Sequence, residues 1–325
     1  MFPTSSQVKF WMFADDKEIL CLRKEANERF IKEHGKSKSA EERQEFFLTT
    51  AEERSLQRHY EYILKEFCAR FQPPMPRAVV GCSMAYFKRV YIHNSLMDYH
   101  PREMMLTCVY LACKVEEFNV SINQFVANLK GDRERFADLI VSCELMLMHH
   151  LHYHLTMHSP YRPFEGLMID MKTRCKSITD VEKIRKGADD FMDRSLNTDA
   201  MLLFSPSQIA LAAILHSASR LQQNLDKYVT ETLLGPVDND KIKKTIEQIK
   251  RVRYMIRNQE PLNREFVRNI EKKLEKCRNQ ENNPSSEVYK RKMEEKWDDE
   301  VERQTRKRQK TSEEEQRLDE EIIGT

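Results

Sequence analysis

The stretch "HPREMMLTCVYLACK" (residues 100–114) predicts a helix that begins at Pro101, because proline is favoured in the first helical turn. After Arg102 and Glu103, positions 104–113 are apolar except for Thr107, and the run stops at Lys114. A helix that is apolar on all sides belongs in the middle of a bundle. Two glutamates follow in "VEEF" (115–118), so Lys114 lies where a buried helix meets the surface.

A second stretch, "SPSQIALAAILHSAS" (205–219), aligns with the first at a constant offset of 105 residues. Both stretches begin with a capping-type residue and a proline, and both continue as an apolar helix that contains small side chains. This predicts a duplicated all-helical domain, although two unrelated buried helices would give the same pattern. Ser219 stands where the first stretch has Lys114, so only the first copy carries a cation there.

Glycine is scarce, with seven residues in 325, which favours a helical protein with few tight turns. The closest pair, Gly166 and Gly187, is too far apart for a G-x-G-x-x-G or G-x-x-x-x-G-K-[ST] loop. The standard glycine-rich phosphate cradles are therefore excluded. We expect no cofactor, and any nucleotide-dependent activity would belong to a partner.

The 54 basic and 52 acidic residues nearly balance, so net charge gives no reason to expect nucleic-acid or membrane binding. The eight cysteines form no C-x-x-C pair, which suits a reducing compartment. The N-terminus has no apolar signal-peptide region. The uncharged run 200–219 approaches membrane-spanning length, but "SPSQ" interrupts it and predicts a helix start instead.

Apolar positions 19, 22, 26 and 30 predict an amphipathic helix over residues 15–34, followed by a polar connector at 35–50. Helical patterns then continue to about residue 277, with breaks at "PPMPR" (73–77) and "HSPYRPF" (158–164). The last amphipathic helix is marked by four residues, Phe266, Ile270, Leu274 and Cys277. In the tail 279–325, 24 of 47 residues are charged, which predicts disorder with a transient helix around 287–303.

The segment "MPRAVVGCSMAYFKRVYIHNSLMDYHPREMMLTCVYLACKVEEFNV" (75–120) resembles a cyclin box, and within the cyclin family it is most similar to the cyclin H branch. Three further segments agree in order and spacing: "SSQVKFWMF" (5–13), "SPYRPFEGLMIDMKTR" (159–174) and "SPSQIALAAILHSASR" (205–220). The resemblance covers about residues 5–260. It implies two five-helix cyclin folds in tandem with an additional helix at each end.

The expected domains are an N-terminal segment (1–50), a first cyclin box (51–157), a second cyclin box (158–261), a C-terminal helix (262–278) and the charged tail (279–325).

The resemblance also implies a kinase-binding site. In cyclins, a lysine at the place of Lys114 and a glutamate about 30 residues later, here Glu144, contact the kinase. The alternative for Lys114 alone is a helix C-terminal lysine that interacts with the helix dipole. The apolar face around the pair would include Leu111, Val115, Met148, Tyr153 and Leu155, each of which could equally belong to the core.

The function implied is that of a non-catalytic regulatory subunit. Such a subunit binds a cyclin-dependent kinase and holds its αC helix in the active position. The cyclin H branch implies the kinase-activating complex, with a RING-finger assembly factor and the core of general transcription factor IIH as partners and a nuclear location. The alternatives are a transcription factor that binds nucleic acid, as factor IIB does with the same tandem fold, or a cyclin C-like partner of another transcriptional kinase.

The run "HHLHYHLTMH" (149–158) holds five of the ten histidines. His150 and His154 have the spacing of two zinc ligands on a helix, but no third ligand stands at a recognisable distance and no H-E-x-x-H occurs. Histidines between apolar anchors are most simply solvent-facing, so we expect no metal site and no metal-dependent hydrolase.

The basic run "RQTRKRQK" (303–310) is a candidate nuclear localisation signal through Arg306, Lys307, Arg308 and Lys310. A solvated charge cluster is the alternative. Ser312 precedes "EEE" and is a candidate phosphorylation site.

Overall fold

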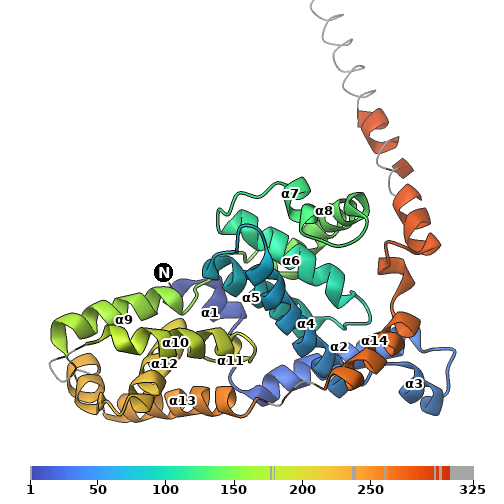
Figure 1. Cartoon of the computed structure of the whole chain (residues 1–325). Helices are drawn as coiled ribbons and strands as arrows, with labels where there is room; N and C mark the ends of the chain where they lie inside the picture. The colour runs from blue at the N-terminus through green and yellow to red at the C-terminus, as the bar shows by residue number, and fades with distance from the viewer. Residues whose placement is uncertain are drawn as a thin grey trace, which may run out of the picture. The chain divides into compact units, whose positions relative to one another are not determined.

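The computed structural model describes residues 2–175, 178, 180–235, 239–259, 261, 263–295, 298–299 and 302–307. Every regular element among them is a helix and none is a strand, which confirms the predicted all-α class. The chain forms two compact units, Met1–Cys277 and Arg278–Thr325. Figure 1 labels the helices of the first unit. None of the described helices combines the length with the apolar character needed to cross a membrane.

The first five-helix fold, called repeat one below, surrounds a central buried helix. Its helices are α4 (Thr50–Arg70), α5 (Arg77–His93), α6 (Pro101–Val115), α7 (Ile122–Ala127) and α8 (Arg133–His150). Capping boxes begin α4 and α7, where Thr49 and Ser121 accept hydrogen bonds from the third helical amide. The central helix α6 begins with proline as predicted and buries every residue from Met104 to Cys113.

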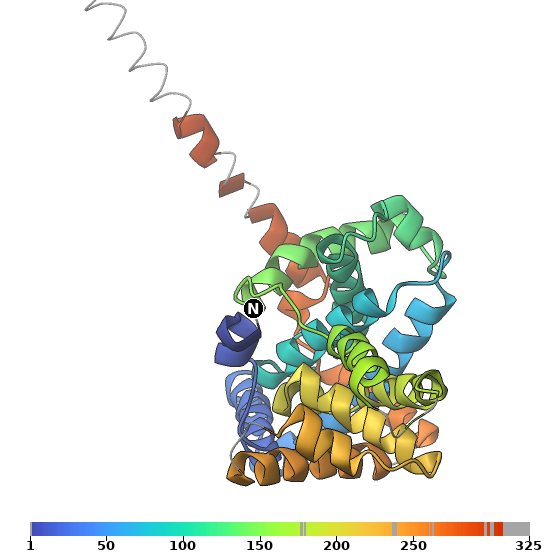
Figure 2. The ribbon, with the colours of Figure 1, turned by 90° about the vertical axis from the view of Figure 1, so that its left-hand side faces the viewer.

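The second fold, called repeat two, has the same order of helices. They are α9 (Tyr161–Arg174), α10 (Glu182–Ser195), α12 (Pro206–Arg220), a π-helix (Tyr228–Leu233) and α13 (Asn239–Arg257). A short additional helix, α11 (Ala200–Leu203), precedes α12. Figure 2 shows α12 and α13, in yellow and orange, side by side.

The backbone confirms the predicted duplication. The central helices begin at Pro101 and Pro206, which are 105 residues apart. Each helix ends in the same cap, with Glu117 at φ 56° and Gln222 at φ 57°. In both caps the next amide donates to the carbonyl five residues back at 2.9 Å. Two unrelated helices would not share the starting proline, the offset and the cap. The alternative of two unrelated buried helices is therefore excluded.

The N-terminal segment contributes three helices, α1 (Ser6–Phe10), α2 (Asp16–His34) and α3 (Ala40–Phe46). Asp15 caps α2, which buries Ile19, Ala26 and Phe30 as the pattern predicted. The predicted connector 35–50 was wrong in part, because it contains α3, which starts with a capping box of Ser39 and Glu42. That signal is local and was present in the sequence.

The predicted C-terminal helix is α14 (Arg264–Cys277), which packs against α3 and α4. Ile270, Leu274 and Cys277 are buried, as predicted. Phe266 is a correction, because it is exposed and Val267 takes the buried position. Residues 267, 270, 274 and 277 follow the helical period from one inward face, and position 266 falls about a quarter turn away.

The tail was predicted to hold a helix around 287–303, and the structure has helical turns at 287–295, 298–299 and 302–307. Arg306 lies in the last of these and pairs with Glu302 at 3.2 Å on a well-exposed surface. Lys307 lies beside it. Three of the residues singled out in the sequence, Arg308, Lys310 and Ser312, lie outside the described residues.

A buried charge network connects the two repeats. Lys88 of α5 and Glu61 of α4 are both fully buried, with Nζ and Oε2 2.7 Å apart. Asp199, which precedes α11, accepts two hydrogen bonds from Arg23 of α2 and one from Arg54 of α4. Arg54 also reaches Glu61 at 3.1 Å. Because buried charges are costly without partners, this network fixes how α2, α4 and α5 meet repeat two.

Candidate functional site

Lys114 and Glu144 form an ion pair at the surface of repeat one. The Lys114 Nζ donates to both Glu144 carboxylate oxygens, at 2.7 and 2.8 Å, and lies 4.7 Å from the centre of the Tyr110 ring. The lysine side chain is 48% exposed and the glutamate side chain 15%. The two predicted residues therefore come together from the end of α6 and the middle of α8. They satisfy each other in the free chain, so a second protein is not needed to pair them.

Two exposed apolar residues flank the pair on α8. Val141 is 57% exposed and Leu145 is 63% exposed, and Met148 is half-buried beside them. Relative to Glu144 they lie at −3, +1 and +4, which is one face of a helix. The sequence analysis missed Val141 and Leu145, although their spacing from Glu144 was a readable signal. We call Lys114, Val141, Glu144, Leu145 and Met148 the α6–α8 face.

The other predicted residues divide between core and surface. Leu111 is only 3% exposed, because it lies on the inner side of α6, and so it takes the core alternative left open above. Val115, Met148 and Leu155 are half-buried against the core of repeat one. Tyr153 is exposed.

Hydrogen bonds from α5 and α8 hold the loop that carries Tyr153 and Leu155. The Tyr153 amide donates to the Met148 carbonyl at 2.9 Å with Tyr153 at φ 57°. Tyr86, which is buried in α5, donates its hydroxyl to the Leu155 carbonyl. Arg89 donates to the His154 carbonyl at 3.1 Å. These contacts fix the position of the loop relative to α5.

The N-terminal segment packs on the histidine run. The prediction that the histidines simply face solvent was wrong for His150, His154 and His158, which are half-buried. Trp11 donates from Nε1 to His154 Nδ1 at 3.1 Å, and Phe10 stacks on the same ring at 4.7 Å. Gln7 accepts a hydrogen bond from the His158 amide at 2.8 Å. Burial, with the nearby charges of His152 and Arg89, lowers the pKa of His154, in keeping with a neutral ring that accepts from the indole.

Among the residues that the structure describes, no group of three or more histidine, cysteine or acidic side chains is arranged to hold a metal ion. None of the eight cysteines, all of which lie at described positions, forms a disulfide.

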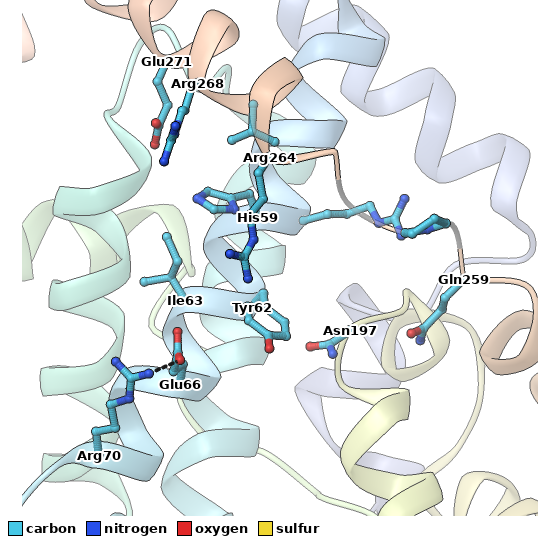
Figure 3. Close-up of a pocket in the computed structure, with 13 residues that line it drawn as sticks. His59, Tyr62, Ile63, Glu66, Arg70, Asn197, Gln259, Arg264, Arg268 and Glu271 are labelled. Carbon is cyan, nitrogen blue, oxygen red and sulfur yellow. Dashed lines mark hydrogen bonds and ion pairs between the residues drawn. The ribbon is translucent and has the colours of Figure 1, made fainter.

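Figure 3 shows a groove of about 800 Å³ elsewhere in the first unit, between α4 and α14. Tyr62 and Ile63 of α4 lie on one wall, with Arg264 and Arg268 of α14 above them. Its charges are partly compensated within the wall, because Glu66 pairs with Arg70 and the Tyr60 hydroxyl donates to Glu271 at 3.1 Å. None of the residues of the α6–α8 face lines this groove.

Comparisons with known proteins agree with this geometry. The family model for the cyclin N-terminal domain matches residues 28–156, and that for the cyclin C-terminal domain matches residues 159–257. Cyclin-H of Xenopus laevis is 41% identical over 284 residues, which cover 86% of this chain and 88% of the relative. A probable cyclin-H of Echinococcus multilocularis is 30% identical and covers 89% of this chain and 95% of its own.

Two solved structures share the fold. A chain of the CAK complex from Chaetomium thermophilum aligns with a TM-score of 0.76 at 24% identity, covering 91% of this chain and 93% of that one. A chain of the yeast TFIIK complex aligns with a TM-score of 0.62 at 24% identity, covering 78% and 99%. From the two cyclin domains and the extent of these similarities, the chain belongs to the cyclin family, within its cyclin H branch.

Proposed function

We propose that the chain is the regulatory subunit of a cyclin-dependent kinase and that the α6–α8 face binds the kinase. The observation that carries this is the Lys114–Glu144 pair beside the exposed Val141 and Leu145. Exposed apolar side chains next to a fixed charge pair are typical of a protein-binding surface. Tyr153, Leu155 and Val115 extend this face towards the loop that follows α8.

The pair can bind a partner while it stays intact. Lys114 has a further N–H to donate, and the Glu144 oxygens have lone pairs left to accept hydrogen bonds. A kinase backbone carbonyl and amide would take these positions at once. Leu145 and Val141 would then lose their solvent contact against the apolar surface of the kinase.

The kinase would be activated because the α6–α8 face that binds it is rigid. A kinase is active when its αC glutamate pairs with the lysine of strand β3, which requires αC to move inward. The face rests on a central helix that is buried from Met104 to Cys113, so it presents a shape that does not yield. Binding that favours the inward αC shifts the kinase population towards the active state. The chain itself supplies no chemical group to the reaction.

The kinase we propose is the one of the kinase-activating complex, which acts in the cell cycle and in RNA polymerase II transcription. The similar chains of the CAK and TFIIK complexes support this choice. The same proposal includes a RING-finger assembly factor, the core of factor IIH and a nuclear location, for which Arg306 and Lys307 are candidate signal residues.

The two alternatives stated above are weaker. A factor IIB-like protein would need a zinc ribbon and a strongly basic repeat, and the sequence has no C-x-x-C pair. A cyclin C-like role has some support, because Cyclin-C of Drosophila melanogaster is 30% identical over 191 residues, 55% of this chain and 68% of the relative. The cyclin H relatives cover far more of the chain.

The test is Lys114→Ala and Glu144→Ala in the full chain, with the kinase catalytic subunit of the kinase-activating complex. An exposed ion pair adds about 0–1 kcal/mol to stability, so both variants should keep the helical circular-dichroism spectrum. Loss of one partner of a desolvated charge pair in an interface costs about 2–5 kcal/mol, so the dissociation constant should rise at least about thirtyfold. Kinase stimulation should fall with it.

The matched control is Lys172→Ala, which removes a similarly exposed ion pair, with Glu182, from repeat two. This control should bind and stimulate the kinase as the unmodified chain does. Unchanged kinase activation by both Lys114→Ala and Glu144→Ala would overturn the proposed contact.

A further inference from the structure

Repeat two carries a groove at the position equivalent to the α6–α8 face. Its volume is about 420 Å³, and it lies between the end of α12, the π-helix and α13. Five of its lining residues are Ser219, Ile246, Ile249, Lys250 and Arg253. The residues 105 positions earlier are Lys114, Val141, Glu144, Leu145 and Met148, which are the α6–α8 face. The duplication has therefore kept a surface at this position and changed its chemistry.

The floor of this repeat-two groove is apolar. Ala218 at the end of α12, Leu225 and Val229 before and in the π-helix, and Ile249 of α13 are all buried and line it. Leu215 and Ile246 are half-buried and widen it. None of the described lining residues is aromatic.

Cations without partners gather along α13 and the end of α12. Lys250 and Arg253 line the groove, and Arg220 and Arg257 lie near by, since both act with Arg253 on the pKa of His216. None of these four cations has an ion pair within the part of the chain that the structure describes. Burial first and the charge of Arg257 second lower the pKa of Arg253. The lining also contains one carboxylate, Asp226, but the four cations outnumber it, and this excess of positive charge favours an anionic partner.

The groove also contains a side-chain acceptor that could bind the backbone of a partner, the oxygen of Gln223. The side-chain oxygen of Gln223 is buried and has no hydrogen-bond partner. Gln223 lines the groove directly after the cap at Gln222, together with Asn224. A buried acceptor left unpaired is costly, and a backbone N–H of a bound chain would satisfy it.

We propose that the repeat-two groove docks a short acidic, amphipathic segment of a partner polypeptide. Its apolar side chains would cover the floor around Val229 and Ile249, and its carboxylates would pair with Lys250 and Arg253. Nucleic acid fits less well, because the floor is aliphatic and offers no ring for a base to stack on. This inference goes beyond the kinase contact, and it leaves repeat one free to bind the kinase at the same time.

The test measures fluorescence anisotropy of labelled probes with the full chain at physiological salt. The first probe is a peptide of about 14 residues, four helical turns, made of glutamate and leucine with leucines at positions i, i+3, i+4 and i+7. The others are a scrambled peptide of the same composition and a single-stranded DNA of similar length. The ordered acidic peptide should bind at least about tenfold more tightly than either.

Two variants locate the binding. Lys250→Glu with Arg253→Glu should weaken the acidic peptide at least about tenfold. Ser219→Trp, at an exposed position of the wall, should fill the groove and weaken it likewise without a change in the core. The charge-matched control is Lys32→Glu with Lys36→Glu, at exposed positions outside the groove, which should bind as the unmodified chain does.

Equal binding of the ordered and scrambled peptides would overturn the proposal, as would binding that both groove variants leave unchanged. DNA that binds more tightly than the acidic peptide and is lost in Lys250→Glu/Arg253→Glu would also overturn it, in favour of a nucleic-acid groove. Kinase stimulation is measured on the same variants. Lys114→Ala should lose kinase stimulation and keep peptide binding, whereas the groove variants should lose peptide binding and keep kinase stimulation. The two readouts therefore test this proposal and the proposed function separately.

Discussion

Repeat one and repeat two have the same backbone plan and different outer chemistry. The buried positions of the central helices correspond closely, with Cys108 and Val109 of α6 at the places of Ala213 and Ile214 of α12. All four side chains are fully buried and apolar. The outward positions differ, because repeat two has Ser219 at the position of Lys114. Core packing therefore preserves the fold in both copies, while the surface at the same place is free to acquire another partner.

The largest expected effect concerns the charge network that connects the two repeats. In Lys88→Ala, Glu61 and Asp199 lose a buried cation and keep only arginine partners. Loss of one partner of a buried pair costs about 3–5 kcal/mol, which urea unfolding of the full chain would measure.

The control for that variant is Glu61→Met with Lys88→Met, which removes both charges and keeps apolar volume. Replacement of a buried pair by apolar residues is often neutral or stabilising, so the double variant should be more stable than Lys88→Ala. A Lys88→Ala chain as stable as the unmodified one would show that the repeats are not held together by this network.

A smaller effect is expected from pH and distinguishes the repeats. Glu53 is buried at the start of α4, accepts from the Ser95 hydroxyl and the Leu96 amide, and has a pKa raised to about 7, mainly by burial. A raised pKa means that the folded chain holds the proton more tightly than the unfolded chain. Stability from Glu53 is thus present at low pH and lost as pH rises towards about 7.

Between about pH 5.5 and pH 8, Glu53 should lower the free energy of unfolding by about 2 kcal/mol relative to Glu53→Gln. The glutamine keeps an oxygen for both donors and does not titrate. The position 105 residues later is His158, so repeat two has no carboxyl at the equivalent place. Parallel pH profiles for the two chains would contradict the assignment.

The smallest effect is expected from removal of residues 279–325. Both repeats and α14 belong to the unit Met1–Cys277, and the tail belongs to the other unit. The shortened chain should melt within about 2 °C of the full chain, because so charged a segment buries little apolar surface. A fall of many degrees in differential scanning calorimetry would mean that the tail stabilises the repeats.

Much of the fold was readable from the sequence because its signals are local. Proline at the first turn and the apolar run predicted α6 and α12, and the spacing of 19, 22, 26 and 30 predicted α2, in which Leu22 is half-buried and the other three are buried. The errors also have a local origin. Phe266 was assigned inward by its apolar character, whereas its position on α14 turns it outward.

The candidate site was readable in part. Lys114 and Glu144 were named from the resemblance, yet their mutual pairing joins residues 30 apart in the chain. Leu111 and Leu145 are the same residue type, and only packing makes the first core and the second surface. The sequence pattern left Leu111 open between core and surface, since α6 is apolar on all sides, whereas the spacing of Leu145 from Glu144 was a signal that was missed.

The sequence by itself determined the helical class and the starts of the two central helices, because caps and periodicity act within a few residues, and it indicated the duplication at an offset of 105 that the backbone then confirmed. Only the tertiary structure decided that Trp11 contacts His154, that Asp199 meets cations from α2, α4 and α5, and that Gln223 lines a groove. These contacts depend on how distant helices pack, and packing is set by the whole core at once.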